Sequence, residues 1–260
     1  MIKKIVNKVF ALFKAANVSS SLYPEEYQIP WEILNTKKDY SQETWTYEED
    51  NHIEIHPLSK GKVDVVIKGK YNIVKIGVVK IDSEKLRIVV GGNHNHISIG
   101  NIHTGRRLSL VVGIANSPLY TPIKNCTVEI GNCCWFGECE IRTVNSGTKL
   151  IIEDGVVCSK RVIILHTDNH PIFDRETKKI INSVSNLYIG KHVWIGDDVR
   201  IMKNCCIPGG AIIAASSVLT ASASRKMEPC CIVAGNPAKI VRKNIDFSMD
   251  GSKGYCENNQ

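Results

Sequence analysis

Aliphatic residues recur at every sixth position through the C-terminal half of the chain. From residue 189 the recurring positions hold Ile189, Ile195, Ile201, Ile207, Ile213 and Leu219. Four positions after each of the first five lies a small or β-branched residue, namely Val193, Val199, Cys205, Ala211 and Ser217. Neither the 3.6-residue period of a helix nor the two-residue period of a single strand produces this register. The pattern instead predicts triangular coils, in which each six-residue side points one aliphatic side chain inward.

The same register is present earlier in the chain, but it is less regular. Ile130 and Phe136 lie six positions apart, and so do Ile152, Cys158 and Ile164. Ile-Gly dipeptides recur at 99–100, 130–131, 189–190 and 195–196, where glycine suits a tight corner. Stacked coils satisfy their backbone hydrogen bonds with the coils above and below. The repeats therefore predict a parallel β-helix whose cross-section recurs after roughly 18 residues.

The two ends of the chain do not share this register. Residues 1–60 include an expected amphipathic helix over residues 2–14 and a polar stretch that contains tryptophan. We interpret them as an N-terminal cap or extension, because the end of a solenoid needs a cover. The basic helix could lie on an anionic membrane, although packing against its own protein is favoured. The β-helix is assigned to residues 61–243, and residues 244–260 are expected to be a poorly ordered tail.

A polar segment interrupts the repeat between Ile164 and Leu187. This segment, residues 165–186, reads LHTDNHPIFDRETKKIINSVSN and contains two histidines. An insertion in a solenoid must loop out from one side, and such loops commonly carry function. A neutral imidazole is well matched to proton transfer near pH 7. The loop is therefore the first place to look for chemistry.

Composition and charge narrow the classes of function. The 260 residues are 43% hydrophobic and 23% charged, as in ordinary soluble globular proteins. The net charge is +7, and the lysines and arginines are scattered along the chain without forming a basic stripe interleaved with aromatic residues. This distribution gives little support to nucleic-acid binding, and suits a polyphosphorylated cofactor or an anionic polymer equally well. The ten cysteines include no CxxC spacing, so we expect reduced thiols in the cytoplasm and no metal site.

Three segments carry a resemblance to a known family. They are HTDNHPIFDRETKKIIN at 166–182, IGKHVWIGDDVRIMKNCCIPGGAIIAASSVLT at 189–220 and CIVAGNPAKIVRK at 231–243. Together they resemble the hexapeptide-repeat O-acetyltransferases, and more closely the bacterial enzymes that acetylate capsular polysaccharide, including sialic-acid capsules. The resemblance implies an all-β, left-handed parallel β-helix with an extruded catalytic loop. It also implies acetyl-CoA as co-substrate, a carbohydrate acceptor, and a homotrimer with active sites between subunits.

The resemblance also implies roles for individual residues of the reaction site. His170 would be the general base that deprotonates the acceptor hydroxyl, and Trp194 would help to form the acetyl and acceptor pocket. Asp168 and His166 could orient the imidazole, with the role of His166 left open. No cysteine falls at the motif position, which favours direct transfer over an acetyl-enzyme intermediate.

Further residues are implied at the coenzyme A site. Lysine is a point-charge partner for phosphate, which suits Lys203 and Lys239 to the pyrophosphate and 3′-phosphate of coenzyme A. Small side chains would let the pantetheine arm lie close to the coil backbone, and Asn236 and Pro237 would shape the exit of the last coil. The small residues are Ala214, Ala215 and Ser216.

Several alternatives stay open. Thr220 lies where the sialic-acid capsule enzymes have a larger aromatic residue, so a small sugar, a sugar nucleotide or an antibiotic competes with a polymer as acceptor. A γ-class carbonic anhydrase would need three histidines converging on zinc, and no such spacing emerges. A non-catalytic β-helix scaffold is the third alternative. We expect the protein in the bacterial cytoplasm, with a peripheral position at the inner membrane face as a variant of that location.

Overall fold

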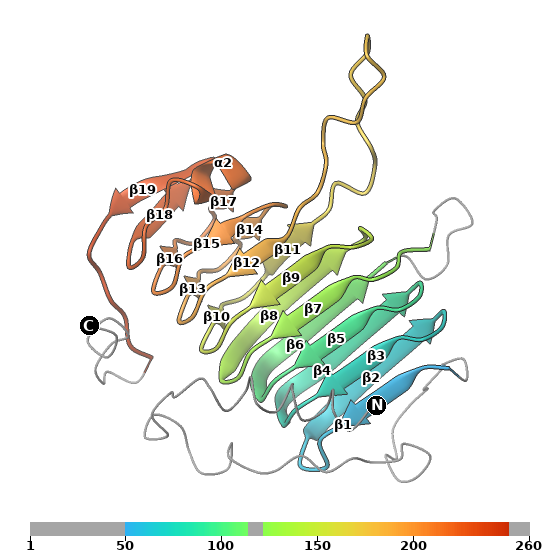
Figure 1. Ribbon diagram of the computed structural model, residues 1–260. Helices are drawn as coiled ribbons and strands as arrows, with labels where there is room; N and C mark the ends of the chain where they lie inside the picture. The colour runs from blue at the N-terminus through green and yellow to red at the C-terminus, as the bar shows by residue number, and fades with distance from the viewer. Residues whose placement is uncertain (1–49, 114–121, 250–260) are drawn as a thin grey trace, which may run out of the picture. The chain divides into compact units, whose positions relative to one another are not determined.

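The computed structural model describes residues 50–113 and 122–249 (Figure 1). The helix expected over residues 2–14 and the tail from residue 250 lie outside these ranges. Within them the chain is almost entirely β-structure, with one short helix, α2 (Ala221–Ser224). No helix of the described part is long and apolar enough to cross a membrane.

One side of the stacked coils is a seven-stranded sheet in which each strand pairs with the strand of the next coil. Its strands, in order, are β1 (His52–Ile55), β3 (Ile73–Ile76), β5 (His96–Ile99), β7 (Thr127–Ile130), β9 (Lys149–Ile152), β12 (Leu187–Ile189) and β15 (Cys206–Ile207). All of these pairings are parallel. The sheet is therefore a ladder that runs along the axis of the β-helix.

A twelve-stranded sheet forms the other two sides. Its long strands are β2 (Lys60–Lys68), β4 (Val79–Gly91), β6 (Ile102–Val112) and β8 (Cys134–Thr143). The second side continues with β10 (Val157–Cys158), β13 (Trp194–Ile195), β16 (Ile212–Ile213) and β18 (Ile232–Gly235), and the third with β11 (Val162–His166), β14 (Arg200–Ile201) and β17 (Val218–Leu219). Because β8 pairs with β10 through its first half and with β11 through its second half, it spans the corner between these two sides. The last strand, β19 (Ala238–Arg242), returns antiparallel to β18.

The predicted six-residue register is confirmed. Every aliphatic position from Ile189 to Leu219 is fully buried, and so are the five smaller residues between them. In this region Trp194 pairs with Ile212 and Arg200 with Val218, an offset of 18 residues in each case. The core is a continuous column of these inward side chains.

The first coils contain more residues than the roughly 18 that the register predicts, and the β-helix begins before residue 61. Ile73 pairs with His96, an offset of 23 residues, because the long strands shift register where they turn the corner. The first strand begins at His52, so residues 52–60 belong to the β-helix and the boundary expected at residue 61 is wrong. These coils hide the pattern because their corners contain extra residues.

Glycine at the Ile-Gly dipeptides is required by the close approach of the next coil and not by a left-handed backbone conformation. Gly131 and Gly196 are not among the residues with positive φ. A Cβ atom on Gly131 would lie 2.7 Å from the backbone nitrogen of Asp154, and one on Gly196 would lie 2.7 Å from that of Ala215. The next coil therefore passes too close for a side chain.

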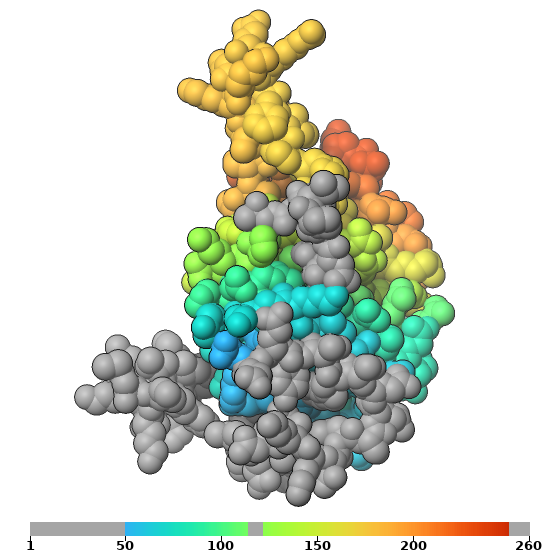
Figure 2. Space-filling view, turned by 90° about the vertical axis from the view of Figure 1, so that its right-hand side faces the viewer, coloured from blue at the N-terminus to red at the C-terminus, as the bar shows by residue number. Residues whose placement is uncertain are grey.

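The insertion rises from the corner between β11 and β12. Leu165 and His166 belong to β11, so the loop proper covers residues 167–186 instead of 165–186. An antiparallel bridge between Phe173 and Ile180 closes its outer part. The loop projects well beyond the stacked coils (Figure 2).

The chain after β19 contacts the β-helix through Phe247, where a poorly ordered tail was expected. The backbone nitrogen of Ile245 donates to the carbonyl oxygen of Cys230 at 2.9 Å. Eight described cysteines are free thiols, in line with the expectation, whereas Cys230 is disulfide-bonded.

Candidate active site

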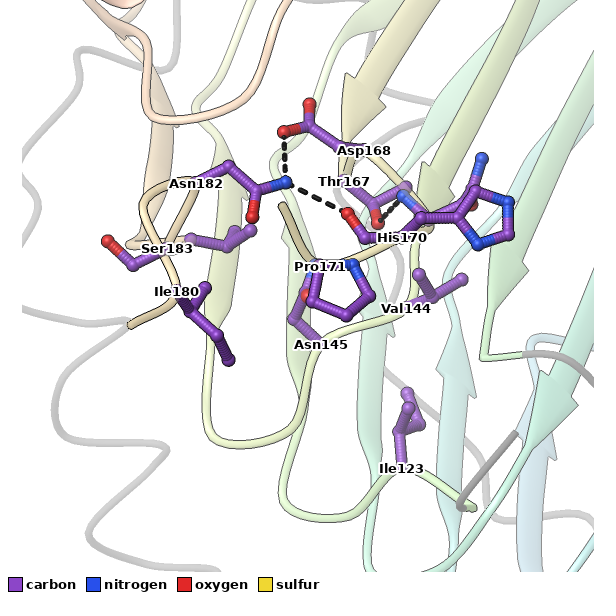
Figure 3. Close-up of a pocket in the computed structure, with 12 residues that line it drawn as sticks. Ile123, Val144, Asn145, Thr167, Asp168, His170, Pro171, Ile180, Asn182 and Ser183 are labelled. Atoms are coloured by element: carbon purple, nitrogen blue, oxygen red, sulfur yellow. Dashed lines mark hydrogen bonds between the residues drawn. The ribbon is translucent and has the colours of Figure 1, made fainter. Parts of the chain in front are cut away.

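A hollow of about 370 Å³ lies at the base of the loop (Figure 3). The outgoing stem of the loop lines it with residues 167–171, and the returning stem with Ile180 and residues 182–184. Val144 and Asn145, from the corner of the preceding coil, complete it together with Ile123. The predicted polar insertion therefore forms most of a concave site, as ligand sites usually are.

A tight turn presents His170 on the rim of this hollow. The backbone nitrogen of His170 donates to the carbonyl oxygen of Asp168 at 2.8 Å, and that of Asn169 donates to Thr167 Oγ1 at 2.9 Å. Asn169 has a φ of 63°, a conformation that asparagine tolerates better than most residues. The side chain of His170 is exposed. A substrate hydroxyl could therefore reach its imidazole.

Asp168 contacts one residue of the returning stem, Asn182, and one residue of the next coil, Lys203. Its Oδ2 atom lies 2.5 Å from Lys203 Nζ and accepts a hydrogen bond of 2.8 Å from Asn182 Nδ2. Partial burial acts to raise the pKa of Asp168, but the hydrogen bonds from Lys203 and Asn182 and the lysine charge outweigh it and lower the pKa. Asp168 is therefore an anion held between the stems.

His166 points into the core instead of toward the hollow. It is fully buried, with Nδ1 3.1 Å from Thr143 Oγ1 and Nε2 2.6 Å from the carbonyl oxygen of Ser185. Burial lowers its pKa, and the hydrogen bond to Ser185 opposes this shift only in part. The chain turns at Asn169, where φ is 63°, so residues 166–170 do not form one extended segment that would place His166 on the same side as His170. His166 fastens the end of the loop to the coils.

Trp194 lies on the second side of the β-helix, on β13. Its side chain points outward with 39% of its surface exposed, because it directly precedes the inward Ile195 in the strand. Nε1 donates to Ser159 Oγ at 3.1 Å. Trp194 is not among the residues that line the hollow beside His170.

The residues expected at the coenzyme A site are accessible, except for Lys203. Lys239 is exposed on β19, and Asn236 and Pro237 are exposed in the hairpin before it, joined by a cis peptide bond. The small residues Ala214, Ala215 and Ser216 form the turn after β16 and have partly or fully exposed side chains. The Lys203 ammonium, by contrast, also donates to the carbonyl oxygen of Asn182 at 2.6 Å. No group of side chains in the described ranges has the composition of a metal site.

Two residues at these sites were not found from the sequence. Asn182 contacts both Asp168 and the backbone of His170, yet it looks like any loop asparagine. Phe247 packs on His192 and Trp194 from the segment after β19, which the sequence assigned to a poorly ordered tail. The available signal was the alternation of Ile245, Phe247 and Met249 with polar residues, which is typical of a segment with one packed face.

Comparison with known proteins identifies the family. No protein-family model matches the chain. The polysialic acid O-acetyltransferase of Neisseria meningitidis is 30% identical over 148 residues, which cover 52% of this chain and 68% of that protein. The polysialic acid O-acetyltransferase of Escherichia coli O1:K1 / APEC is 36% identical over 87 residues, and this match spans 34% of the chain but only 27% of the relative.

The fold agrees with these sequence matches. The crystal structure of the polySia-specific acetyltransferase NeuO superposes with a TM-score of 0.61 at 26% identity, over 81% of each chain. This likeness confirms the predicted left-handed β-helix. The chain belongs to the family of hexapeptide-repeat O-acetyltransferases that includes the polysialic acid O-acetyltransferases.

Proposed function

We propose that this protein transfers an acetyl group from acetyl-CoA to a hydroxyl of a bacterial capsular polysaccharide, with His170 as the general base. One observation carries the proposal: a polar insertion in a β-helix of this family presents an exposed histidine on the rim of a hollow. The family relation gives acetyl transfer as the reaction class. The net charge of +7 suits both an anionic polymer and coenzyme A.

In the proposed reaction the acceptor oxygen attacks the thioester carbonyl carbon while the imidazole of His170 takes the hydroxyl proton. The tetrahedral intermediate then collapses, the carbon–sulfur bond breaks, and the thiolate of coenzyme A takes the proton back. The acetyl ester is formed without an acetyl-enzyme. A base of this kind contributes about 10²–10⁴-fold to the rate.

We assign the phosphates of coenzyme A to Lys239 and the pantetheine arm to the turn at residues 214–216. The backbone nitrogen of Ala215 lies 2.7 Å from where a Cβ of Gly196 would lie, so this turn packs directly on the preceding coil, and its own small side chains are partly or fully exposed. Asn236 and Pro237 border the same end of the β-helix. This part of the proposal rests on accessible small or basic residues in the positions that the family pattern gives them.

The homotrimer belongs to the same proposal. Within one chain Trp194 is absent from the hollow beside His170, and an active site between subunits would supply Trp194 from a neighbour. The outer loop also exposes more than half of four large apolar side chains, which a neighbouring subunit could cover. These side chains are Ile172, Phe173, Ile180 and Ile181.

The acceptor is tested by incubating the protein with acetyl-CoA and a panel of capsular oligosaccharides, with free sugars, sugar nucleotides and chloramphenicol alongside. Thiol release and a mass gain of about one acetyl group per modified hydroxyl identify the substrate. We expect the charged oligosaccharides to be acetylated. Transfer to the small acceptors alone would replace the polymer in this proposal.

A further inference from the structure

We infer that Asn182 and Lys203 are positioning residues for the His170 base, acting through a clamp that they form with Asp168. This inference rests on the proposed function, because it gives these residues a role in placing the general base. Neither residue needs to touch a substrate for this role. In this inference Lys203 holds the loop that carries His170, and it does not bind a phosphate of coenzyme A as the sequence resemblance implied.

Lys203 joins both stems of the loop to the next coil. It lies in the turn between β14 and β15, and its side chain is 17% exposed. Its ammonium contacts Asp168 Oδ2 on the outgoing stem and the carbonyl oxygen of Asn182 on the returning stem. A charge-assisted hydrogen bond to each stem fixes their separation. Lys203 is therefore the anchor of the clamp on the rigid β-helix.

Asn182 connects the clamp to the histidine itself. Its Nδ2 group donates to Asp168 Oδ2 at 2.8 Å and to the carbonyl oxygen of His170 at 2.9 Å, as Figure 3 shows. Its Oδ1 atom accepts a hydrogen bond of 2.7 Å from the backbone nitrogen of Ile172. One amide thus holds the backbone on both sides of Pro171. The imidazole of His170 projects from a backbone that this amide fixes.

A small displacement of a general base is costly. A misplacement of about 1 Å can lower the rate by roughly 100-fold, even when the changed residue lies away from the chemistry. Loss of the clamp should therefore lower kcat, because the loop still exists but holds the base less accurately. A phosphate contact would behave differently, since its loss weakens the binding of coenzyme A.

The test compares Asn182→Ala, Lys203→Met and Lys203→Arg in the full chain. We expect the first two to lower kcat by about 10- to 100-fold, with the Kd of coenzyme A, measured by calorimetry, within about twofold of wild type. Lys203→Arg keeps the charge and the donors, and should recover most of kcat. The double variant Asn182→Ala/Lys203→Met should lose less than the product of the two single losses, because both act on one unit.

Two control variants test whether the loss of any lysine or asparagine side chain would lower kcat. Lys243→Met removes an exposed lysine that pairs with Glu228 at 2.6 Å, away from the loop. Asn186→Ala removes an asparagine at the end of the same loop, whose Oδ1 accepts from the backbone nitrogen of Lys149 at 2.9 Å. Both should keep the wild-type kcat. If Lys203→Met does not fold, Asp168→Asn tests the same ion pair with an isosteric side chain.

Wild-type kcat in Asn182→Ala would overturn the clamp. So would a Lys203→Met variant with unchanged kcat and coenzyme A binding at least tenfold weaker, which would restore the phosphate role. Two other results would contradict the proposed function itself and not only the clamp. One is full activity in His170→Ala, and the other is a wild-type protein that transfers no acetyl group.

Discussion

Phe247 packs against Trp194, with ring centroids 5.8 Å apart and ring planes inclined by 45°. The same phenyl ring stacks on His192 at 4.1 Å and 11°, and His192 Nε2 lies 2.9 Å from the carbonyl oxygen of Phe247. The segment after β19 therefore crosses the second side of the β-helix at Trp194, which we propose contributes to the acetyl and acceptor pocket. The position of the indole depends on a residue 53 positions away in the sequence.

Replacing Phe247 with alanine should loosen Trp194. An aromatic pair contributes about 0.5–1.5 kcal/mol beyond its buried area, so we expect a weaker substrate affinity and a red-shifted tryptophan emission that Trp194→Phe abolishes. Val241→Ala is the control, since Val241 is 61% exposed. Emission and KM equal to wild type in Phe247→Ala would show that the contact has no role at this site.

His166 should make the protein less stable as the pH falls. Burial lowers its pKa in the folded state from the ordinary value of 6.5, so the unfolded chain binds a proton at a pH where the folded chain does not. The penalty begins as the pH drops below about 6.5 and is complete below the folded-state pKa. Melting temperatures of wild type and His166→Gln between pH 7.5 and 5 measure it. The two proteins should converge as the pH falls, and a constant difference across that range would contradict the burial effect.

Gly131→Ala should destabilise the fold. The new methyl group would meet Asp154 Oδ1 at 2.5 Å and the Asp154 backbone nitrogen at 2.7 Å. Forcing a methyl group into a packed site costs about 1–3 kcal/mol. In Gly105→Ala the nearest atom is the side chain of Trp135 at 3.1 Å, which can move, so its effect should be smaller. Equal unfolding free energies of the two variants in urea would show that the coils adjust more easily than their spacing indicates.

The sequence predicts the regularly repeated coils of this fold. It does not predict the irregular early coils or the contacts between segments that are distant in the sequence. Inward positions such as Ile207 and Ile213 are apolar because one side chain fills each side of a coil, so their spacing is visible. In the early coils, extra corner residues break that spacing, and the start at His52 is hidden.

The candidate site divides in the same way. His170 is recognisable because a polar loop interrupts a regular repeat, and its turn is local. The contact of Asn182 with His170 spans 12 residues and depends on how the loop folds back. The ion pair of Asp168 with Lys203 spans a full coil and cannot be deduced from a spacing alone.

The central claim is that His170 is the base for acetyl transfer. The direct test measures acetyl-CoA consumption by wild type and His170→Ala on the best charged oligosaccharide, together with the Kd of coenzyme A for both proteins. We expect transfer to fall by about 10²–10⁴-fold while coenzyme A binds with nearly unchanged affinity. Full transfer activity in a folded His170→Ala protein would contradict the claim.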